Sequence, residues 1–189
     1  MIHLRMLFRL VPAIPMLATL TFCDERPNAK IASKYTTLSK GCRILEQDSE
    51  TGSWVRSCPG VAGFQLHVAR DDDRMSVSVV TQDGHKYPLD YWSVVTRGFS
   101  NLGKMAEWRV TLDKGKVTPI ALIVRVDSSE QGKSTPVKRS QFAIAKMTAD
   151  EICVIGKVAA GVNGQSGARL IADSSRDHAC LKPQFPQTN

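Results

Sequence analysis

Short apolar stretches separated by turn residues dominate the chain after Gly41, and this texture is typical of β-strands. Apolar residues at positions 64, 66 and 68 alternate with Gln65, His67 and Ala69, and a period of two returns at positions 75, 77 and 79. A period of two places alternate side chains on one face of a strand. The acidic run Asp71–Asp73 lies between these stretches, so the pattern predicts a β-hairpin with this run at its tip.

Three further pairs of strand-like stretches share this organisation. In each pair, two apolar or alternating runs are separated by residues that favour turns. Separations this short are typical of antiparallel neighbours. We therefore predict a meander of hairpins, whose remaining strands span residues 42–47 and 54–58, 108–112 and 120–126, and 142–147 and 152–158.

Two segments have helical spacing. Apolar residues at positions 92, 95, 99 and 102 recur every three or four residues, but Gly98 and Gly103 interrupt them, so residues 89–102 fit a helix and an irregular loop equally well. Near the C-terminus, Asn163 is a candidate N-cap, and residues 168, 171, 172 and 175 fall on one helical face. The predicted fold class is α+β: mainly antiparallel β-sheet with one short C-terminal helix.

The first 23 residues have the layout of a secretory signal. Arg5 and Arg9 precede an uncharged run at positions 10–22, which is too short and too interrupted by proline for a membrane-spanning helix. Small residues before Asp24 suit cleavage after Cys23. In the alternative, Cys23 is the lipidated first residue of an anchored lipoprotein. We expect a periplasmic or secreted protein.

Cleavage after Cys23 divides the chain into four parts. The predicted organisation is a signal peptide at 1–23, a loosely ordered segment at 24–39, a single α+β domain at 40–183 and a flexible tail at 184–189.

Four cysteines remain after this cleavage, and an even number in an exported chain predicts two disulfides. We favour Cys42 with Cys58 and Cys153 with Cys180, because each pair closes a local loop. The competing arrangement is a four-cysteine zinc site, which would need paired C-x-x-C motifs that the sequence lacks. We expect no metal and no cofactor.

The cleaved chain is moderately basic. It keeps 23 basic and 18 acidic residues, a net charge of +5. This charge is compatible with an envelope protein, a glycan or an anionic lipid as partner, whereas nucleic acid is not expected of an exported domain. The densest basic cluster lies in a segment predicted as a loop. Together with two tryptophans it gives a predicted recognition surface of Trp54, Trp92, Lys133, Lys138 and Arg139.

Seven segments carry a resemblance: SKYTTLSKGC (33–42), CPGVAGF (58–64), DDDRMSVSV (71–79), LGKMAEWRV (102–110), PIALIVR (119–125), CVIGKV (153–158) and ARLIAD (168–173). Together with Cys180, they resemble a group of small exported proteins from proteobacteria. The likeness covers most of the mature chain. It implies a periplasmic destination and a shared architecture, and it carries no activity or binding residue that can be transferred.

One segment suggests catalysis. The sequence Gly164-Gln-Ser166-Gly167-Ala168 is similar to a nucleophile elbow, in which a serine on a strand-to-helix turn is exposed to substrate. Ala168 replaces the final glycine of that motif. His178 or His67 would be the base for Ser166. The alternative is structural, because small and polar residues also satisfy the free N–H groups of a helix start.

Two acidic features have competing interpretations. The run Asp71–Asp73 is a hairpin tip or a calcium site, although a calcium loop would also need a downstream carboxylate and a glycine. Glu107 beside Trp108 is a candidate general acid. Glu107 and Arg109 share the strand face opposite Trp108, so we predict instead a surface ion pair.

These observations favour a non-enzymatic envelope or binding module. The alternatives are a small serine hydrolase that uses Ser166 and a secreted enzyme inhibitor that presents the disulfide-closed loop 42–58.

Overall fold

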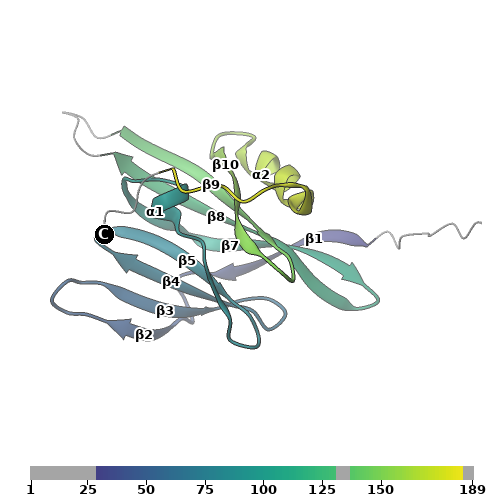
Figure 1. Cartoon of the computed structure of the whole chain (residues 1–189), viewed down its shortest axis with the longest axis horizontal. Coiled ribbons are helices and arrows are strands. Elements are labelled where there is room, and N and C mark those ends of the chain that lie inside the picture. The colour runs from purple at the N-terminus through teal and green to yellow at the C-terminus, as the bar shows by residue number, and fades with distance from the viewer. Residues whose placement is uncertain (1–28, 131–136, 185–189) are drawn as a thin grey trace, which may run out of the picture.

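Two five-stranded antiparallel sheets face each other in the computed structural model, which describes residues 29–130 and 137–184 (Figure 1). The short-strand sheet follows chain order and contains β2 (Arg43–Gln47), β3 (Trp54–Pro59), β4 (Gln65–Asp71), β5 (Arg74–Val80) and β6 (Lys86–Pro88). The long-strand sheet has the order β1-β7-β8-β9-β10 and contains β1 (Lys30–Thr37), β7 (Phe99–Asp113), β8 (Lys116–Glu130), β9 (Val137–Met147) and β10 (Ile152–Ala159). Helix α1 (Tyr91–Val94) precedes β7, and α2 (Gly164–Asp173), followed by a 3-10 turn (Ser175–Asp177), comes after β10. The predicted α+β class, mainly antiparallel with one short C-terminal helix, is confirmed.

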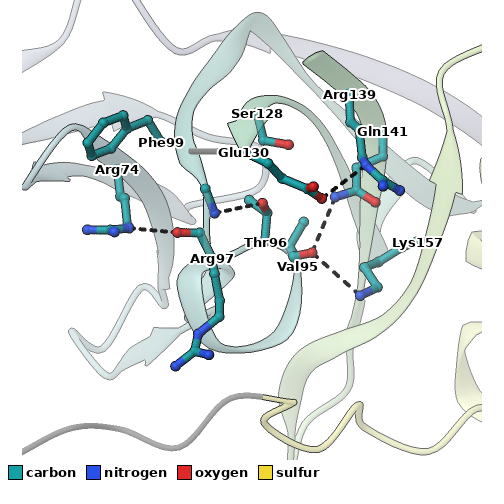
Figure 2. A pocket seen from close by; sticks show the side chains of 11 residues that line it. Arg74, Val95, Thr96, Arg97, Phe99, Ser128, Glu130, Arg139, Gln141 and Lys157 are labelled. Atoms are coloured by element: carbon teal, nitrogen blue, oxygen red, sulfur yellow. Dashed lines mark hydrogen bonds and ion pairs between the residues drawn. The ribbon is translucent and has the colours of Figure 1, made fainter. Parts of the chain in front are cut away.

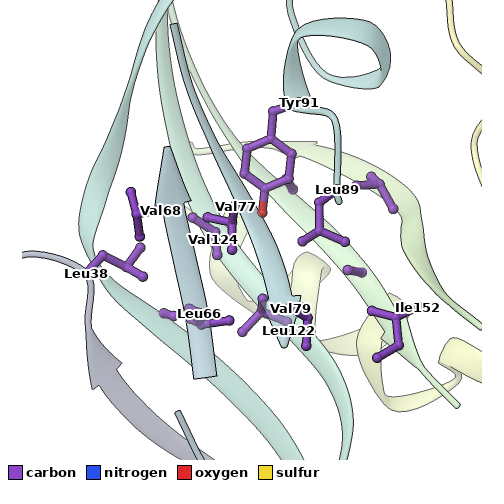
Figure 3. Packing of buried hydrophobic residues seen from close by; sticks show 14 of the residues in the cluster. Leu38, Leu66, Val68, Val77, Val79, Leu89, Tyr91, Leu122, Val124 and Ile152 are labelled. Carbon is purple, nitrogen blue, oxygen red and sulfur yellow. The ribbon is translucent and has the colours of Figure 1, made fainter. Parts of the chain in front are cut away.

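The main core lies between the two sheets. Leu66 and Val77 of the short-strand sheet and Trp108 and Val124 of the long-strand sheet are at most 1% exposed. Figure 3 shows side chains of both sheets meeting there, together with Tyr91 of α1. Complete burial of one such side chain stabilises the fold by about 1.5–3 kcal/mol. The period-two alternation seen in the sequence therefore fixes which strand faces turn inward.

Helix α2 forms a third layer on the outer face of the long-strand sheet (Figure 1). Ala168 and Ala172 of the helix are fully buried against Ile123 and Ile144. Neighbouring residues of β8 are therefore buried on opposite faces of the sheet. Leu122 packs towards the other sheet, and Ile123 packs towards α2. Burial on both faces explains why residues 120–126 form a nearly continuous apolar run.

The segment predicted to be loosely ordered contains a strand. Residues 30–37 form β1, which pairs with β7 from Lys30 opposite Leu112 to Thr37 opposite Met105. The prediction that the domain begins at residue 40 is therefore wrong. As an edge strand, β1 has side chains that are exposed or half-buried on both faces, so no clear hydrophobic alternation marks it.

The ambiguous segment 89–102 contains both helix and strand. One helical turn forms at α1, an irregular loop follows, and β7 begins at Phe99. Tyr91 is almost completely buried, and its backbone N–H donates to the Ser76 hydroxyl at 3.1 Å. Burial raises the pKa of Tyr91 well above its ordinary value. The helical spacing of apolar residues therefore corresponds to a helix only at α1, and the rest of the segment is loop and strand.

Both predicted disulfides are present. Cys42 bonds to Cys58 at the base of the β2–β3 hairpin, and Cys153 of β10 bonds to Cys180 beyond α2. Each is expected to contribute about 3 kcal/mol by restricting the unfolded chain. Disulfides form in oxidising compartments, so the protein is extracytoplasmic. In the described ranges, no helix has the length and hydrophobicity needed to cross a bilayer.

Candidate anion-binding pocket

A pocket of about 530 Å³ opens at the end of the sandwich where β5, β7 and β9 begin and β8 ends (Figure 2). One wall is the loop between α1 and β7, and the opposite wall is the long-strand sheet. Its charged and amide-bearing lining residues are Arg74, Arg97, Glu130, Arg139, Gln141 and Lys157.

Strand register positions the sheet side of the pocket. Arg139 of β9 is paired with Ser128 of β8, and Lys157 of β10 is paired with Ala143 of β9. Side chains of directly paired residues project from the same face of a sheet. Ala143 belongs to the core between the two sheets, so Lys157 points towards that interior. Ser128 follows Val124 by four residues and points the same way.

Hydrogen bonds between side chains and the backbone hold the loop wall in place. The Nε of Arg74 donates to the carbonyl of Arg97 at 3.0 Å, and the N–H of Gly98 donates to the Thr96 hydroxyl at 3.1 Å (Figure 2). A Cβ atom on Gly98 would lie 2.5 Å from the carbonyl oxygen of Ser129. Only glycine therefore lets the loop approach β8 this closely.

Positive charge exceeds negative charge in this lining. Arg74, Arg97, Arg139 and Lys157 carry four cationic groups, and Glu130 carries the one carboxylate among the lining residues. Glu130 is paired with Arg139 at 3.1 Å. The pocket therefore keeps a net positive charge, and it is called the basic pocket below.

Lys157 is a lining cation whose hydrogen-bond acceptors are neutral. Its Nζ lies 3.0 Å from the side-chain oxygen of Gln184 and 3.5 Å from the carbonyl oxygen of Val95, and both acceptors are neutral. No carboxylate pairs with Lys157 within the described ranges 29–130 and 137–184. Partial burial lowers the pKa of Lys157. An anionic oxygen is the partner that this ammonium lacks.

The predicted recognition surface does not come together as one site. Arg139 lines this pocket and also a neighbouring one of about 410 Å³, whereas Lys138 lines only the neighbouring pocket. Lys133 lies outside the described residues. Trp54 stacks with the Arg56 guanidinium at 4.1 Å, and neither it nor Trp92 lines the pocket. The prediction that Lys138 and Arg139 lie in a loop is wrong, because both belong to β9.

The structure separates Ser166 from the histidines proposed as its base. Ser166 is exposed in the first turn of α2, and His178 follows the far end of this ten-residue helix, which spans about 15 Å. His178 Nε2 lies 3.1 Å from the hydroxyl of Ser174 instead. His67 belongs to β4 of the other sheet. Gly164 has a packing role, because a Cβ there would lie 2.3 Å from the carbonyl oxygen of Ala159.

The predicted ion pair between Glu107 and Arg109 is present, with Arg109 Nη1 3.8 Å from the Glu107 carboxylate, but the prediction that it lies at the surface is wrong, because both side chains are largely covered. Glu107 is 3% exposed, and its carboxylate accepts hydrogen bonds from Ser33, Gln165 and Arg169, the last at 2.7 Å. The Nε and Nη2 of Arg109 donate to Asp173 at 2.6 and 2.8 Å. Hydrogen bonding to Glu107 raises the pKa of Arg169. The pattern missed this burial because the covering helix lies about 60 residues further along the chain.

Two further clusters have structural explanations. Asp71–Asp73 forms the β4–β5 tip, where Asp72 and Asp73 have positive φ angles and pair with Arg74 and Arg70. Glu151 lies near the sulfurs of Cys153 and Cys180, an arrangement of potential metal ligands. Both sulfurs are bonded to each other, and metal coordination needs thiolates, so we assign no metal site there.

Comparison of the chain with protein-family models, curated protein sequences and solved structures finds no match. The function is therefore inferred from the chemistry of the pocket.

Proposed function

We propose that this protein is a non-enzymatic binding module of the periplasm, and that its basic pocket holds an anionic oxygen group of an envelope glycan or lipid. The observation that carries the proposal is Lys157, a partly buried ammonium with only neutral oxygens as partners. A carboxylate or phosphate at this position would form a charge-assisted hydrogen bond, which is shorter and stronger than a neutral one.

The surrounding lining supports this chemistry. Arg139 and the other cations raise the positive potential without filling the pocket with carboxylates. Ser128 and Thr96 add hydroxyl groups, which can donate to an anionic oxygen. A volume of about 530 Å³ is within the range of small-molecule sites. The lining has no histidine or cysteine, which favours binding over catalysis.

Binding measurements on purified mature protein test this proposal. Titration calorimetry with inorganic phosphate, with glucuronate and with vesicles containing an anionic phospholipid compares the possible sources of the anion. We expect saturable binding to at least one of them, weakening as salt increases. Lys157→Met should lower the affinity by about tenfold, as expected for a charge-assisted hydrogen bond.

The matched control is Lys138→Met, which removes the same charge from the other face of the same sheet. It should change the affinity by less than about twofold, because an exposed charge outside the pocket is screened by solvent. Equal effects of the two variants, or no binding to any of the three probes, would rule out a specific pocket.

Export to the periplasm is part of the proposal. It is supported by the two disulfides and by the signal-like layout of residues 1–23, which lie outside the described residues. Mass spectrometry of the protein isolated from the envelope should give an N-terminus at Asp24. A lipidated Cys23 would instead identify an anchored lipoprotein, and a cytoplasmic protein with an intact Met1 would contradict export.

A further inference from the structure

We propose that the C-terminal segment 180–184 is a built-in competitor for this pocket, with the side-chain oxygen of Gln184 in the position that a ligand oxygen takes on Lys157. This inference rests on the proposed function, because it concerns the regulation of the same site. It follows from the path of the segment and from the nature of its contact with Lys157.

The path of the segment brings Gln184 to the pocket. After α2 the chain is fixed to β10 by the disulfide between Cys180 and Cys153, and the N–H of Leu181 donates to the carbonyl of Val154 at 2.7 Å. The N–H of Gln184 then donates to the carbonyl of Ser93 in α1 at 3.0 Å. Figure 1 shows this final stretch, in yellow, running from α2 towards α1. The segment therefore bridges β10 and α1, next to the sheet wall and the loop wall of the pocket.

The contact of Gln184 with Lys157 is easily replaced. At 3.0 Å the amide oxygen of Gln184 is the closer of the two acceptors of Lys157 Nζ, and Val95 at 3.5 Å is at the limit of hydrogen bonding. The acceptor is neutral, and Gln184 is exposed. Charge-assisted hydrogen bonds are about twice as strong as neutral ones, so an anionic ligand displaces the amide from Lys157.

The disulfide makes this competition effective. Fixing the segment at Cys180, four residues before Gln184, keeps the amide at a high local concentration near Lys157. An unattached segment would pay a larger entropic cost for the same contact. In the free protein, the ammonium of Lys157 thus donates a weak hydrogen bond to Gln184, which an anion replaces when it binds.

Two substitutions at Gln184 test this inference, with inorganic phosphate as the probe in titration calorimetry. Gln184→Ala removes the competitor and should tighten phosphate binding by about threefold, as expected for one neutral hydrogen bond. Gln184→Glu places a carboxylate on Lys157 and should weaken phosphate binding by about threefold, because the competitor is now charged. A merely structural role for Gln184 would move both variants in the same direction.

Every outcome decides the question. Opposite shifts in the two variants support the competitor, and shifts of the same sign or unchanged affinities overturn it. If phosphate binds neither the wild-type protein nor Gln184→Ala, both the proposed phosphate site and its competitor are rejected. If phosphate binds in a Lys157-dependent way but ignores Gln184, the competitor alone is rejected. Thermal unfolding of both variants is the folding control.

Discussion

A charged cluster on the outer face of the long-strand sheet and the basic pocket on its inner face differ in how completely their charges are paired. On the outer face, Glu107 accepts several hydrogen bonds beneath α2, and Arg109 forms a two-point contact with Asp173. On the inner face, Lys157 at the basic pocket has two neutral acceptors. The Glu107 carboxylate is paired with cations, whereas the Lys157 ammonium has only neutral partners.

This difference separates a structural role from a binding role. A buried carboxylate surrounded by donors has little capacity left to bind a ligand, and its loss would leave Arg109 and Arg169 without this partner. The Glu107 cluster thus fastens α2 to the sheet. A partly buried cation has lost part of its hydration. If it has no anionic partner in the free protein, binding an anion stabilises it. Incomplete pairing, more than charge itself, is what marks the basic pocket as a site.

The largest expected effect is the loss of Glu107. Glu107→Ala should lower the free energy of unfolding by about 3 kcal/mol, near the lower limit for a broken buried ion pair, because Arg109 keeps Asp173. Urea denaturation of purified protein measures this value. The variant should still bind phosphate like the wild-type protein as long as it is folded, because Glu107 faces away from the basic pocket.

Glu130→Ala is the comparison for this prediction. Glu130 pairs with Arg139 at a half-exposed position, and such pairs contribute about 0–1 kcal/mol. Removing it should therefore leave stability almost unchanged and should increase the positive charge of the basic pocket. If Glu130→Ala destabilised the protein as much as Glu107→Ala, the proposed difference between a structural role for Glu107 and a binding role for the basic pocket would be contradicted.

The same contrast explains what the sequence predicts well. Residues 66–79 alternate in polarity because one face of each strand meets the core, and this pattern is local enough to be read directly. Cys42 and Cys58 likewise close a short loop. The edge strand β1 lacks such a pattern, since its stability depends on backbone pairing with β7, which lies about 70 residues further on. Alternation also cannot show that a helix will cover Glu107.

The basic pocket was harder still to predict. Arg74, Arg97 and Lys157 belong to different elements, and each looks like an ordinary surface charge in its own segment. Strand register and the short loop after α1 bring them together. The sequence points instead to the denser run of Lys133, Lys138 and Arg139, of which only Arg139 lines the basic pocket among the described residues. The density of basic residues along the sequence therefore does not predict which of them meet in one pocket.

A smaller effect is expected from raising the pH. Partial burial holds the pKa of Lys157 below its ordinary value of 10.5, and phosphate needs the charged ammonium. Affinity should therefore fall by about tenfold as the pH rises through this lowered pKa, whereas Lys157→Arg should keep its affinity because a guanidinium stays charged.

The unfolding free energy should rise slightly over the same window, because the unfolded chain binds more protons. Calorimetric titrations between pH 7 and about pH 10.5 measure the affinity; parallel curves for both proteins would exclude Lys157 as the titrating contact.

The smallest effect concerns His67, which lies on the outer face of the short-strand sheet. Burial, followed by the charge of Lys86, lowers the pKa of His67 below 6.5. The unfolded chain therefore binds more protons than the folded one between that lowered pKa and 6.5, so stability should decline as the pH falls through this window. The ring is half-exposed, and the decline should stay below about 0.5 kcal/mol because solvent screens the interaction. Urea denaturation at pH 7 and about pH 5 should show this decline in the wild-type protein and not in His67→Gln. An identical decline in both proteins would mean that another group carries the proton.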